Sequence, residues 1–110
     1  MFSIVTGGER WQAMLDEFVT SMGLASRLAL VRTVAPSGAE IARDPDGALK
    51  LLADACNACV ATDRADVVIL AGAGLAGLAE RIAAKVPVPL LDSVAAAVKA
   101  AEGLAALQPA

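Results

Sequence analysis

The sequence contains no histidine and no tyrosine, and only two cysteines among its 110 residues. These absences remove the most common general base, the most common metal ligand and the phenolic acid of many active sites. Any acid–base chemistry must therefore come from carboxylates, thiols, lysines or a second chain. Cys56 and Cys59 have no histidine or further cysteine to complete a zinc site with them. We therefore expect neither a metal nor a cofactor.

Basic residues are also few, with nine lysines and arginines against twelve acidic residues. They are scattered along the chain, and the formal net charge is −3, which argues against a nucleic-acid partner. The longest uncharged stretch, between Asp66 and Glu80, is too short and too rich in glycine to cross a membrane. The first residues lack the basic region of a secretory signal, so we expect a cytoplasmic protein.

Apolar residues, by contrast, make up 57% of the chain, and much of this fraction is alanine. A chain of this length is enough for one domain with a buried core, so we treat residues 1–110 as a single domain. Strand-like apolar runs alternate strictly with segments of helical spacing. The predicted strands are residues 2–6, 27–34, 67–70 and 87–91, and the predicted helices are residues 11–22, 44–62, 75–84 and 94–107.

This alternation predicts an α/β fold, because strand–helix units with right-handed crossovers build a parallel sheet. We expect a three-layer α/β/α sandwich with a four-stranded parallel sheet in the order 2-1-3-4. Residues 35–43 are interpreted as loop. Pro87 and Pro89 indicate either that they lie at the start of the last strand or that this strand lies at the sheet edge. The predicted core includes two helical stripes: Trp11, Met14, Leu15, Phe18, Val19 and Met22 in the first helix, and Leu51, Leu52, Ala55, Cys56, Cys59 and Val60 in the second.

Two turns rich in small residues follow the first and third predicted strands. In open α/β sheets, ligands bind at the carboxyl ends of the strands, where the backbone N–H groups of such turns are free. The hydroxyl of Thr6, beside two glycines at a strand end, could help to hold an anion. The candidate substrate- or anion-binding residues are Thr6, Gly7, Gly8, Gly72, Ala73 and Gly74.

Residues 72–77 also form a G-x-G-x-x-G sequence between a strand and a helix, with Asp92 twenty residues after Gly72. This context is the one required of a dinucleotide-binding fingerprint. Two facts weigh against it: the motif lies in the third unit, and only one further unit follows. Nucleotide binding by this turn is kept as an alternative to close packing of a small-residue helix.

Cys56 and Cys59 form a Cys-x-x-Cys pair, which invites a redox interpretation. A redox pair normally lies at a helix amino terminus, where the helix dipole lowers the thiol pKa. These two residues lie inside a predicted helix, on its apolar side. We interpret them as ordinary buried thiols.

Three parts of the chain together resemble a known enzyme family. Residues 65–79 have the sequence ADVVILAGAGLAGLA, and residues 87–98 have the sequence PVPLLDSVAAAV. Near the amino terminus, residues 4–6 are followed by Glu-Arg-Trp at 9–11 and Met-Leu at 14–15. In order and spacing these segments resemble the second half of the aspartate/glutamate/hydantoin racemase superfamily, closest to its hydantoin and allantoin racemase branch. The resemblance extends from Phe2 to about residue 102.

The resemblance implies a cofactor-independent isomerase that exchanges a proton at a carbon next to a carbonyl. Two similar α/β halves each supply one cysteine at a strand-to-helix turn. One thiolate removes the proton, and the other thiol returns a proton to the opposite face. Backbone amides at the two turns hold the substrate's carboxylate or amide oxygen. The implied substrate is a small carboxylate or a hydantoin-like molecule.

The sequence departs from this pattern at Gly72, which stands where the second cysteine is expected. We also expect the half that carries the first cysteine to be missing. Either departure predicts no two-base racemisation by this chain alone, and Cys56 and Cys59 lie on the wrong helix to substitute. The related arylmalonate decarboxylases use a single cysteine, so one-sided proton transfer stays open for a full-length relative.

Three hypotheses follow. The first is a racemase-family domain that, if active, acts with a companion first-half chain as an amino-acid or hydantoin racemase-like enzyme, or as a one-thiol relative. The second is a non-catalytic binding or assembly domain whose exposed apolar surface is covered by homo-oligomerisation. The third is nucleotide binding by residues 72–77.

Overall fold

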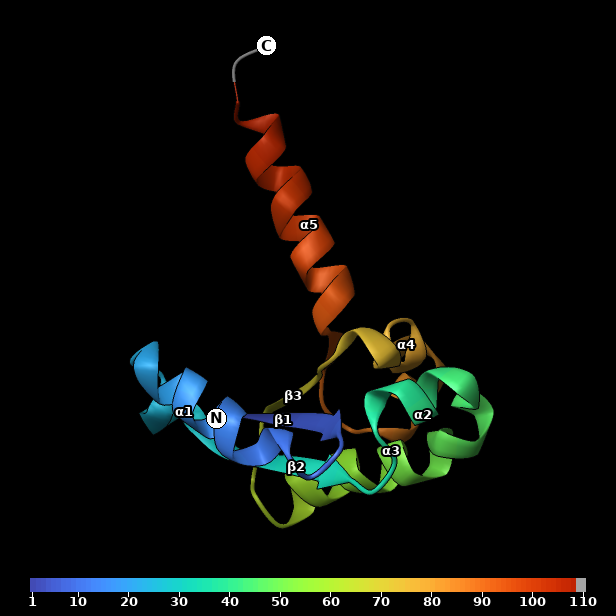
Figure 1. The fold of residues 1–110 in the computed structure, drawn as a ribbon. Helices are drawn as coiled ribbons and strands as arrows, with labels where there is room; N and C mark the ends of the chain where they lie inside the picture. Colours follow the sequence, from blue (N-terminus) through green and yellow to red (C-terminus); the bar gives the residue numbers. More distant parts are fainter. Residues whose placement is uncertain (109–110) are drawn as a thin grey trace.

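The computed structural model describes residues 1–108, and its centre is a parallel sheet of four strands (Figure 1). The strands are β1 (Phe2–Gly7), β2 (Leu28–Val34), β3 (Val67–Leu70) and β4 (Leu90–Asp92), in the spatial order β2-β1-β3-β4. Each neighbouring pair is parallel. The α/β fold and the strand order predicted from the sequence are therefore confirmed.

Helices connect the strands, and a last helix follows β4. They are α1 (Trp11–Ser21), α2 (Gly38–Arg43), α3 (Pro45–Ala61), α4 (Leu78–Ile82) and α5 (Ser93–Ala106). Short 3₁₀ turns lie at η1 (Ala25–Arg27), η2 (Ala73–Leu75) and η3 (Ala83–Lys85). Helix α3 begins as the sequence predicts: the Asp44 side chain accepts a hydrogen bond from the Gly47 N–H, and Pro45 occupies the first turn.

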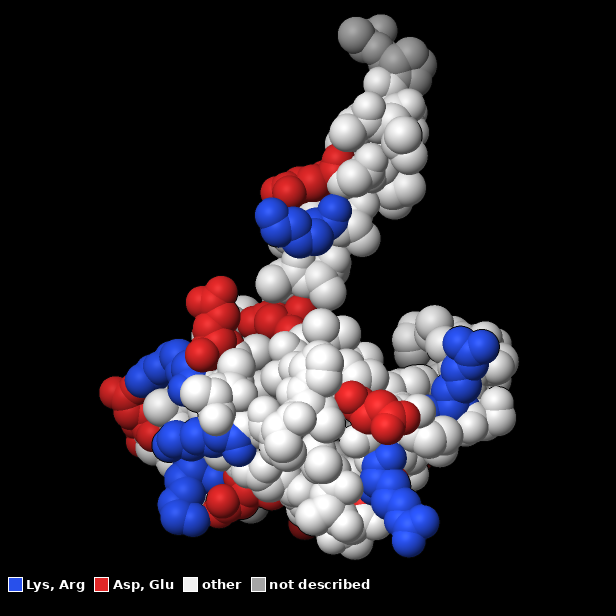
Figure 2. Space-filling view, turned by 180° about the vertical axis from the view of Figure 1, so that it is seen from behind, with Lys and Arg blue, Asp and Glu red and all other residues white. Residues whose placement is uncertain are grey.

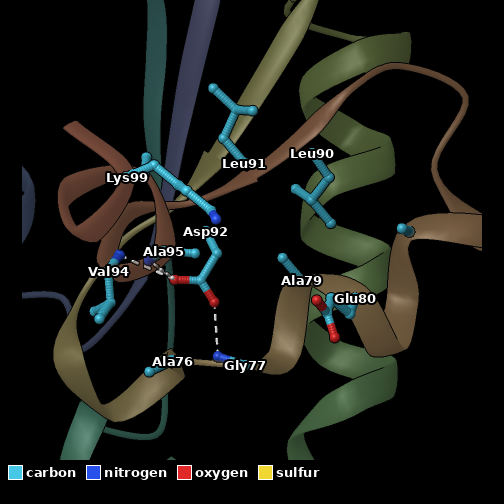
Figure 3. Close-up of a pocket in the computed structure, with 12 residues that line it drawn as sticks. Ala76, Gly77, Ala79, Glu80, Leu90, Leu91, Asp92, Val94, Ala95 and Lys99 are labelled. Carbon is cyan, nitrogen blue, oxygen red and sulfur yellow. Dashed lines mark hydrogen bonds between the residues drawn. The ribbon is translucent and has the colours of Figure 1, made fainter. Parts of the chain in front are cut away.

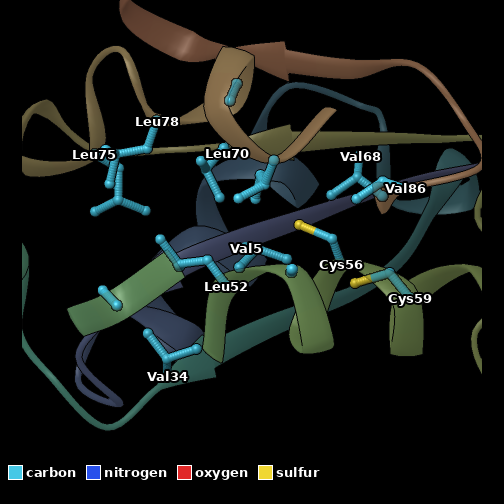
Figure 4. Close-up of a cluster of buried hydrophobic side chains, with 14 of the residues drawn as sticks. Val5, Val34, Leu52, Cys56, Cys59, Val68, Leu70, Leu75, Leu78 and Val86 are labelled. Atoms are coloured by element: carbon cyan, nitrogen blue, oxygen red, sulfur yellow. The ribbon is translucent and has the colours of Figure 1, made fainter. Parts of the chain in front are cut away.

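The buried side chains form two clusters, one on each face of the sheet. The larger cluster lies between the sheet and helices α3 and α4, and it includes Val5, Leu52, Cys56 and Val68 (Figure 4). The smaller cluster lies under α1 and consists of Ile4, Val19 and Val31, with partly buried neighbours. Because strands alternate their side chains between the two faces, β1, β2 and β3 contribute to both clusters, and β4 contributes Leu90 to the larger one.

The interpretation of the α1 stripe as core was wrong for most of its residues. Only Val19 is buried, and Leu15 is partly buried. Four residues are instead between 50% and 59% exposed: Trp11, Met14, Phe18 and Met22. The physical reason is that α1 rests on β2 through one flank of the stripe only. The other flank extends beyond the contact with the sheet.

Leu51 is a second correction, because 47% of this expected core residue is exposed. Residues 38–43, expected to be loop, form helix α2. Its capping box is complete: Ser37 Oγ accepts from the Glu40 N–H, and the Glu40 carboxylate accepts from the Ser37 N–H. The spacing of Ser37 and Glu40 is a sequence signal for a helix start, so the helix could have been predicted.

Two predicted boundaries also differ at the carboxyl-terminal end of the sheet. The helix predicted over residues 75–84 is divided into η2, α4 and η3. Gly77, with a φ of +84°, interrupts the helical backbone between η2 and α4. The strand predicted from residue 87 begins only at Leu90, because Pro87 and Pro89 have no N–H to pair with a neighbour. Strand β4 does lie at the sheet edge, as the prolines predict.

Helix α5 does not join either layer of the sandwich. It follows β4 without an intervening residue and projects away from the sheet (Figure 1). None of its residues 93–106 is buried. The expected three layers are therefore formed by α1, the sheet, and α3 with α4.

Candidate functional site

The turn after β3 lies against the end of β1. Thr6 Oγ1 donates a hydrogen bond of 2.9 Å to the Ala71 carbonyl oxygen. A Cβ atom on Gly72 would lie 3.4 Å from Thr6 Oγ1. Strands β1 and β3 are neighbours, with Val5 paired to Leu70, so their carboxyl ends must meet at this edge. Two segments far apart in the sequence thus form one wall.

A pocket of about 570 Å³ opens at this wall. Five of the six candidate residues line it: Thr6, Gly7, Gly72, Ala73 and Gly74. The sixth, Gly8, is not part of the lining, and its N–H donates to the Val34 carbonyl oxygen over 2.9 Å. The structure therefore brings together the two turns that the sequence singled out and leaves Gly8 beside them.

The polar groups of the pocket are the Thr6 and Ser37 side chains and the backbone of the turn after β3. Gly72 donates to Ser93 Oγ over 3.3 Å. Among the described residues, the N–H groups of Ala73 and Gly74 have no hydrogen-bond acceptor. Adjacent free N–H groups in a turn can bind a carboxylate or a carbonyl oxygen that acquires negative charge. This turn can thus hold an oxygen of a ligand.

Apart from Ser37, the remaining side chains of the walls are apolar, and none of them was predicted as part of a site. Trp11 and Leu15 come from α1, Leu75 comes from η2, and Ala39 and Ala42 come from α2. No Asp, Glu, Lys or Arg lines the pocket. Trp11 could have been found from the sequence, because it lies at the start of the helix that follows the Thr6-Gly7-Gly8 turn.

The backbone of Gly72 adopts a conformation that other residues avoid. Its φ is +109° and its ψ is 142°, a region open to glycine and strained for L-residues. The space for a side chain is nevertheless present, since the nearest contacts of a Cβ atom are 3.4 and 3.9 Å away. The turn therefore has room for a side chain at Gly72, but its backbone path favours glycine.

The glycines of the G-x-G-x-x-G sequence are explained within the protein, Gly74 by close packing and Gly72 and Gly77 by their positive φ values. A Cβ atom on Gly74 would collide with the Gly38 carbonyl oxygen and lie 2.6 Å from its carbon. Gly77 donates a hydrogen bond of 2.6 Å to Asp92 Oδ2. The Asp92 carboxylate, which would have to bind the ribose of a nucleotide, is thus engaged within the chain.

A second pocket, of about 510 Å³, lies between α4, β4 and the first turns of α5 (Figure 3). Asp92 lies at its base and accepts hydrogen bonds from the N–H groups of Gly77, Val94 and Ala95. Burial raises the pKa of Asp92, but the three hydrogen bonds outweigh it and hold the pKa below its ordinary value. Asp92 is therefore the cap that joins β4, α4 and α5.

We expect Asp92→Asn to lower the free energy of unfolding by about 1 kcal/mol at neutral pH, because the amide is a weaker acceptor for three N–H groups. The folded-state pKa is depressed. The contribution is therefore present above the unfolded-state value of about 4 and is lost as the pH falls through the folded-state value. In denaturant titrations, the difference in the free energy of unfolding between the original chain and Asp92→Asn should decrease toward zero at acid pH. Asp54→Asn, in an exposed ion pair of α3, is the control, and a difference that does not vary with pH would contradict the cap.

The two thiols lie in the larger core, away from the pocket (Figure 4). Burial raises the pKa of Cys56 to about 12 and also raises the pKa of Cys59. Both thiols stay protonated at neutral pH, which confirms that they are ordinary buried thiols. Within residues 1–108 there is no group of three or more His, Cys, Asp or Glu side chains placed to hold a metal ion.

No helix within residues 1–108 has the length and apolar character needed to cross a membrane. Fold and site thus define an α/β domain with an uncharged, glycine-lined pocket at the carboxyl ends of two parallel strands. The Asp/Glu/hydantoin racemase family matches residues 1–101. The chain belongs to this family, and the resemblance noted from the sequence is confirmed.

Three curated relatives are hydantoin racemases. Those of Pseudomonas sp. (strain NS671) and Paenarthrobacter aurescens are each 34% identical, over 92% and 96% of this chain, and that of Rhizobium meliloti is 31% identical over 94%. The chain spans 41% to 45% of the length of these relatives, and the match falls on their carboxyl-terminal part.

Two solved structures have the same fold. The allantoin racemase from Pseudomonas fluorescens superposes with a TM-score of 0.88 at 33% identity, over 96% of this chain and 45% of its own. The allantoin racemase from Klebsiella pneumoniae superposes with a TM-score of 0.86 at 28% identity, over 96% of this chain and 43% of its own. The protein is thus a racemase-family domain similar to hydantoin and allantoin racemases.

Proposed function

We propose that this domain binds a small carboxylate or a hydantoin-like ring in the pocket between Thr6 and residues 72–75. The observation that supports it is the contact of the two turns, made by the bond from Thr6 to Ala71. Ala73 and Gly74, whose N–H groups have no acceptor within residues 1–108, line the same pocket as Thr6. These groups hold the oxygen on which negative charge develops when a proton leaves the adjacent carbon.

The same geometry supports the proposal that the chain alone does not racemise its ligand. Gly72 supplies no thiol, and the two thiols of the chain are buried and protonated. A proton acceptor must come from elsewhere, and a companion first-half chain of the racemase family is the proposed source. The buried free thiols also support a reducing, cytoplasmic location.

The walls of the pocket favour a ligand with an apolar substituent. Trp11, Leu15 and Leu75 are available to contact such a group, and no cation lines the pocket to pair with a second carboxylate. Burying an unpaired charge costs several kcal/mol. We therefore favour a hydantoin with an apolar side chain over aspartate or glutamate.

Binding can be measured directly because Trp11 is the only tryptophan of the chain and lines the pocket. Adding 5-benzylhydantoin should change the tryptophan fluorescence in a saturable manner, whereas aspartate should not. Ala73→Pro removes one N–H group at a position where proline fits the start of a turn, and it should weaken binding about tenfold or more. Ala73→Gly keeps the N–H and should bind within about twofold of the original, given the size of one hydrogen bond.

The catalytic part of the proposal has its own test. In deuterated water, the chain alone should not speed the exchange of the C5 proton of 5-benzylhydantoin, the proton next to the carbonyl, above the rate in buffer. Exchange should begin when the amino-terminal half of a relative is added. If binding occurs but no exchange follows in the mixture, the domain is a non-catalytic binding module.

That second candidate, a non-catalytic binding or assembly domain, is favoured by one specific observation. Gly72 has a backbone conformation suited to glycine, so a cysteine at this position would bear a conformational cost. Binding of NAD, FAD or ATP by residues 72–77 is a third candidate. Such binding would raise the melting temperature when the nucleotide is added. The contacts of Gly74 and Asp92 within the chain argue against it.

A further inference from the structure

We propose that the pocket between the turns after β1 and β3 selects a cyclic imide, a ring that contains the sequence O=C–NH–C=O. Thr6 Oγ1 accepts a hydrogen bond from the imide N–H, and Ser37 Oγ donates one to a carbonyl oxygen beside it. The proposal rests on the proposed binding function and narrows its ligand from carboxylates and hydantoin-like rings to imides. It begins from the hydrogen bonds that each hydroxyl group of the pocket has already formed within the chain.

Thr6 Oγ1 has only lone pairs left for a ligand. A carbonyl oxygen has no proton to give, so the hydroxyl proton of Thr6 must lie on the 2.9 Å hydrogen bond to the Ala71 oxygen. Among residues 1–108, no N–H or O–H group donates to Thr6 Oγ1 in return. Thr6 is only 6% exposed, and it lines the pocket. A ligand N–H is therefore the group that this oxygen can bind.

Gly72 leaves the space beside this oxygen open. A Cβ atom on Gly72 would have Thr6 Oγ1 as its nearest neighbour outside the adjacent residues, at 3.4 Å. Any other residue at this position would therefore place a carbon atom against Thr6 Oγ1. The glycine that leaves the turn without a thiol thus also keeps an acceptor of the pocket uncovered.

Ser37 has the opposite capacity for hydrogen bonding. Its Oγ accepts a hydrogen bond of 3.2 Å from the Glu40 N–H, as part of the capping box of α2. Within the described part of the chain, its hydroxyl proton has no acceptor. Ser37 lines the same pocket as Thr6. A ligand carbonyl oxygen is the partner that this free proton fits.

The order of the strands brings these groups to one place. Ser37 follows β2, Thr6 is in β1, and Ala73 and Gly74 follow β3, while β1 lies between β2 and β3 in the sheet. Ser37 Cα would lie 3.8 Å from a Cβ atom on Gly8, so the segment after β2 lies against the end of β1. The pocket therefore combines a donor from the first segment, an acceptor from the second and donors from the third.

The edge of a cyclic imide is complementary to this set. Its central N–H fits Thr6, and one flanking carbonyl oxygen fits Ser37. The other carbonyl oxygen, next to the substituted carbon, fits the N–H groups of Ala73 and Gly74. A carboxylate has no N–H, so it sets an oxygen against the lone pairs of Thr6 or leaves them unpaired, and either result weakens binding.

The charge of the protein favours the same ligand. The formal net charge is −3, and no Lys or Arg lines the pocket. On the face seen in Figure 2, the basic side chains are intermixed with acidic ones and form no large basic patch. Such a surface does not attract an anion, and it does not oppose the approach of a neutral imide.

The first test is a set of ligands that differ by one group, with affinities for the 110-residue chain measured by calorimetry at neutral pH. The reference is 5-benzylhydantoin, whose imide N–H is N3–H. In 5-benzyl-3-methylhydantoin a methyl group replaces this proton, so binding should weaken about tenfold or more. The control, 3-benzylsuccinimide, keeps the imide and lacks the other ring nitrogen. It should bind within about threefold of the reference, since no proposed hydrogen bond is lost.

The second test couples Ser37 to the second carbonyl group. Ser37→Asp keeps an oxygen to cap α2 but replaces the donor with an acceptor. It should weaken the binding of 3-benzylsuccinimide about tenfold or more. It should leave 3-benzylpyrrolidin-2-one, which lacks that carbonyl, within about threefold. Ser37→Asn, which has both a capping oxygen and a donor, should rescue the binding of the succinimide.

The outcomes distinguish this inference from the binding function on which it rests. If 5-benzylhydantoin binds and methylation of N3 has no effect, the binding function stands and the selection of imides is overturned. Equal or tighter binding of 3-phenylpropionate, a carboxylate with the same benzyl group, has the same consequence. If none of these ligands binds, the binding function fails and this inference fails with it. If Ser37→Asp does not fold, the ligand series on the original chain decides.

Discussion

Gly74→Ala should unfold this domain more readily than any other single-methyl addition in the glycine-rich turns. The new Cβ atom would collide with the Gly38 carbonyl oxygen and lie 2.6 Å from the carbonyl carbon and 3.0 Å from the Cα atom. These are backbone atoms at the start of α2, and they cannot move aside as a flexible side chain can. We expect a loss of about 3 kcal/mol or more in the free energy of unfolding. The melting temperature should fall by more than about 10 °C.

The matched control is on the other side of the same contact. Gly38→Ala adds its methyl group to open space, since no atom lies within 4 Å of that Cβ position. It should leave the melting temperature unchanged or raise it, because alanine favours the helix that begins there. Equal losses in the two variants would show that the turn after β3 does not rest on α2 as described.

The second large effect is expected at Gly72, where the difficulty is conformational. Gly72→Ala places an L-residue at a φ of +109°, which costs about 1–3 kcal/mol, although the side chain itself has room. Gly103→Ala, in the open interior of α5, is the control and should cause no loss. Thermal melts of both variants measure the difference, and a Gly72→Ala protein as stable as the original would contradict the backbone path.

Gly72→Cys extends this prediction to chemistry. The new thiol would stand beside Thr6 at the pocket, whereas Cys56 and Cys59 are buried with raised pKa values. Iodoacetamide should therefore modify the variant once under native conditions and leave the original chain unmodified. The variant should bear the same conformational cost as Gly72→Ala. A reactive thiol at this position would therefore not by itself show that an active site has been restored.

The sequence predicted the sheet well because strand character here is a local property. Val67 to Leu70 is a continuous apolar run, and the following glycines mark the turn. The parallel order then follows from the alternation of strands and helices. The meeting of Thr6 with Gly72 is a consequence of that order, because β1 and β3 are neighbours.

The predictions of burial were wrong where the burial of a side chain depends on whether another element packs against it. The α1 stripe has the spacing of a core helix, and only the structure shows that Phe18 and Met14 have nothing above them. The last helix was predicted correctly over residues 94–107, but its direction depends on the absence of a loop after β4. Trp11 was assigned to the core and instead lines the pocket.

Both errors concern the same surface, the flank of α1 and the open half of the sheet. A helical stripe identifies residues that need an apolar neighbour, but the sequence of one chain does not say whether that neighbour lies in the same molecule. The exposed side chains of α1 and the unburied helix α5 are both examples of this limit.

The central claim is that this racemase-family domain holds a ligand oxygen on the backbone N–H groups of the turn after Gly72. An NMR titration of the ¹⁵N-labelled chain with 5-benzylhydantoin tests it most directly. The account predicts saturable shifts of the Ala73 and Gly74 amide signals, with the signal of Leu52 in the core unmoved. Saturable binding that leaves both turn amides in place, or no binding at all, would contradict it.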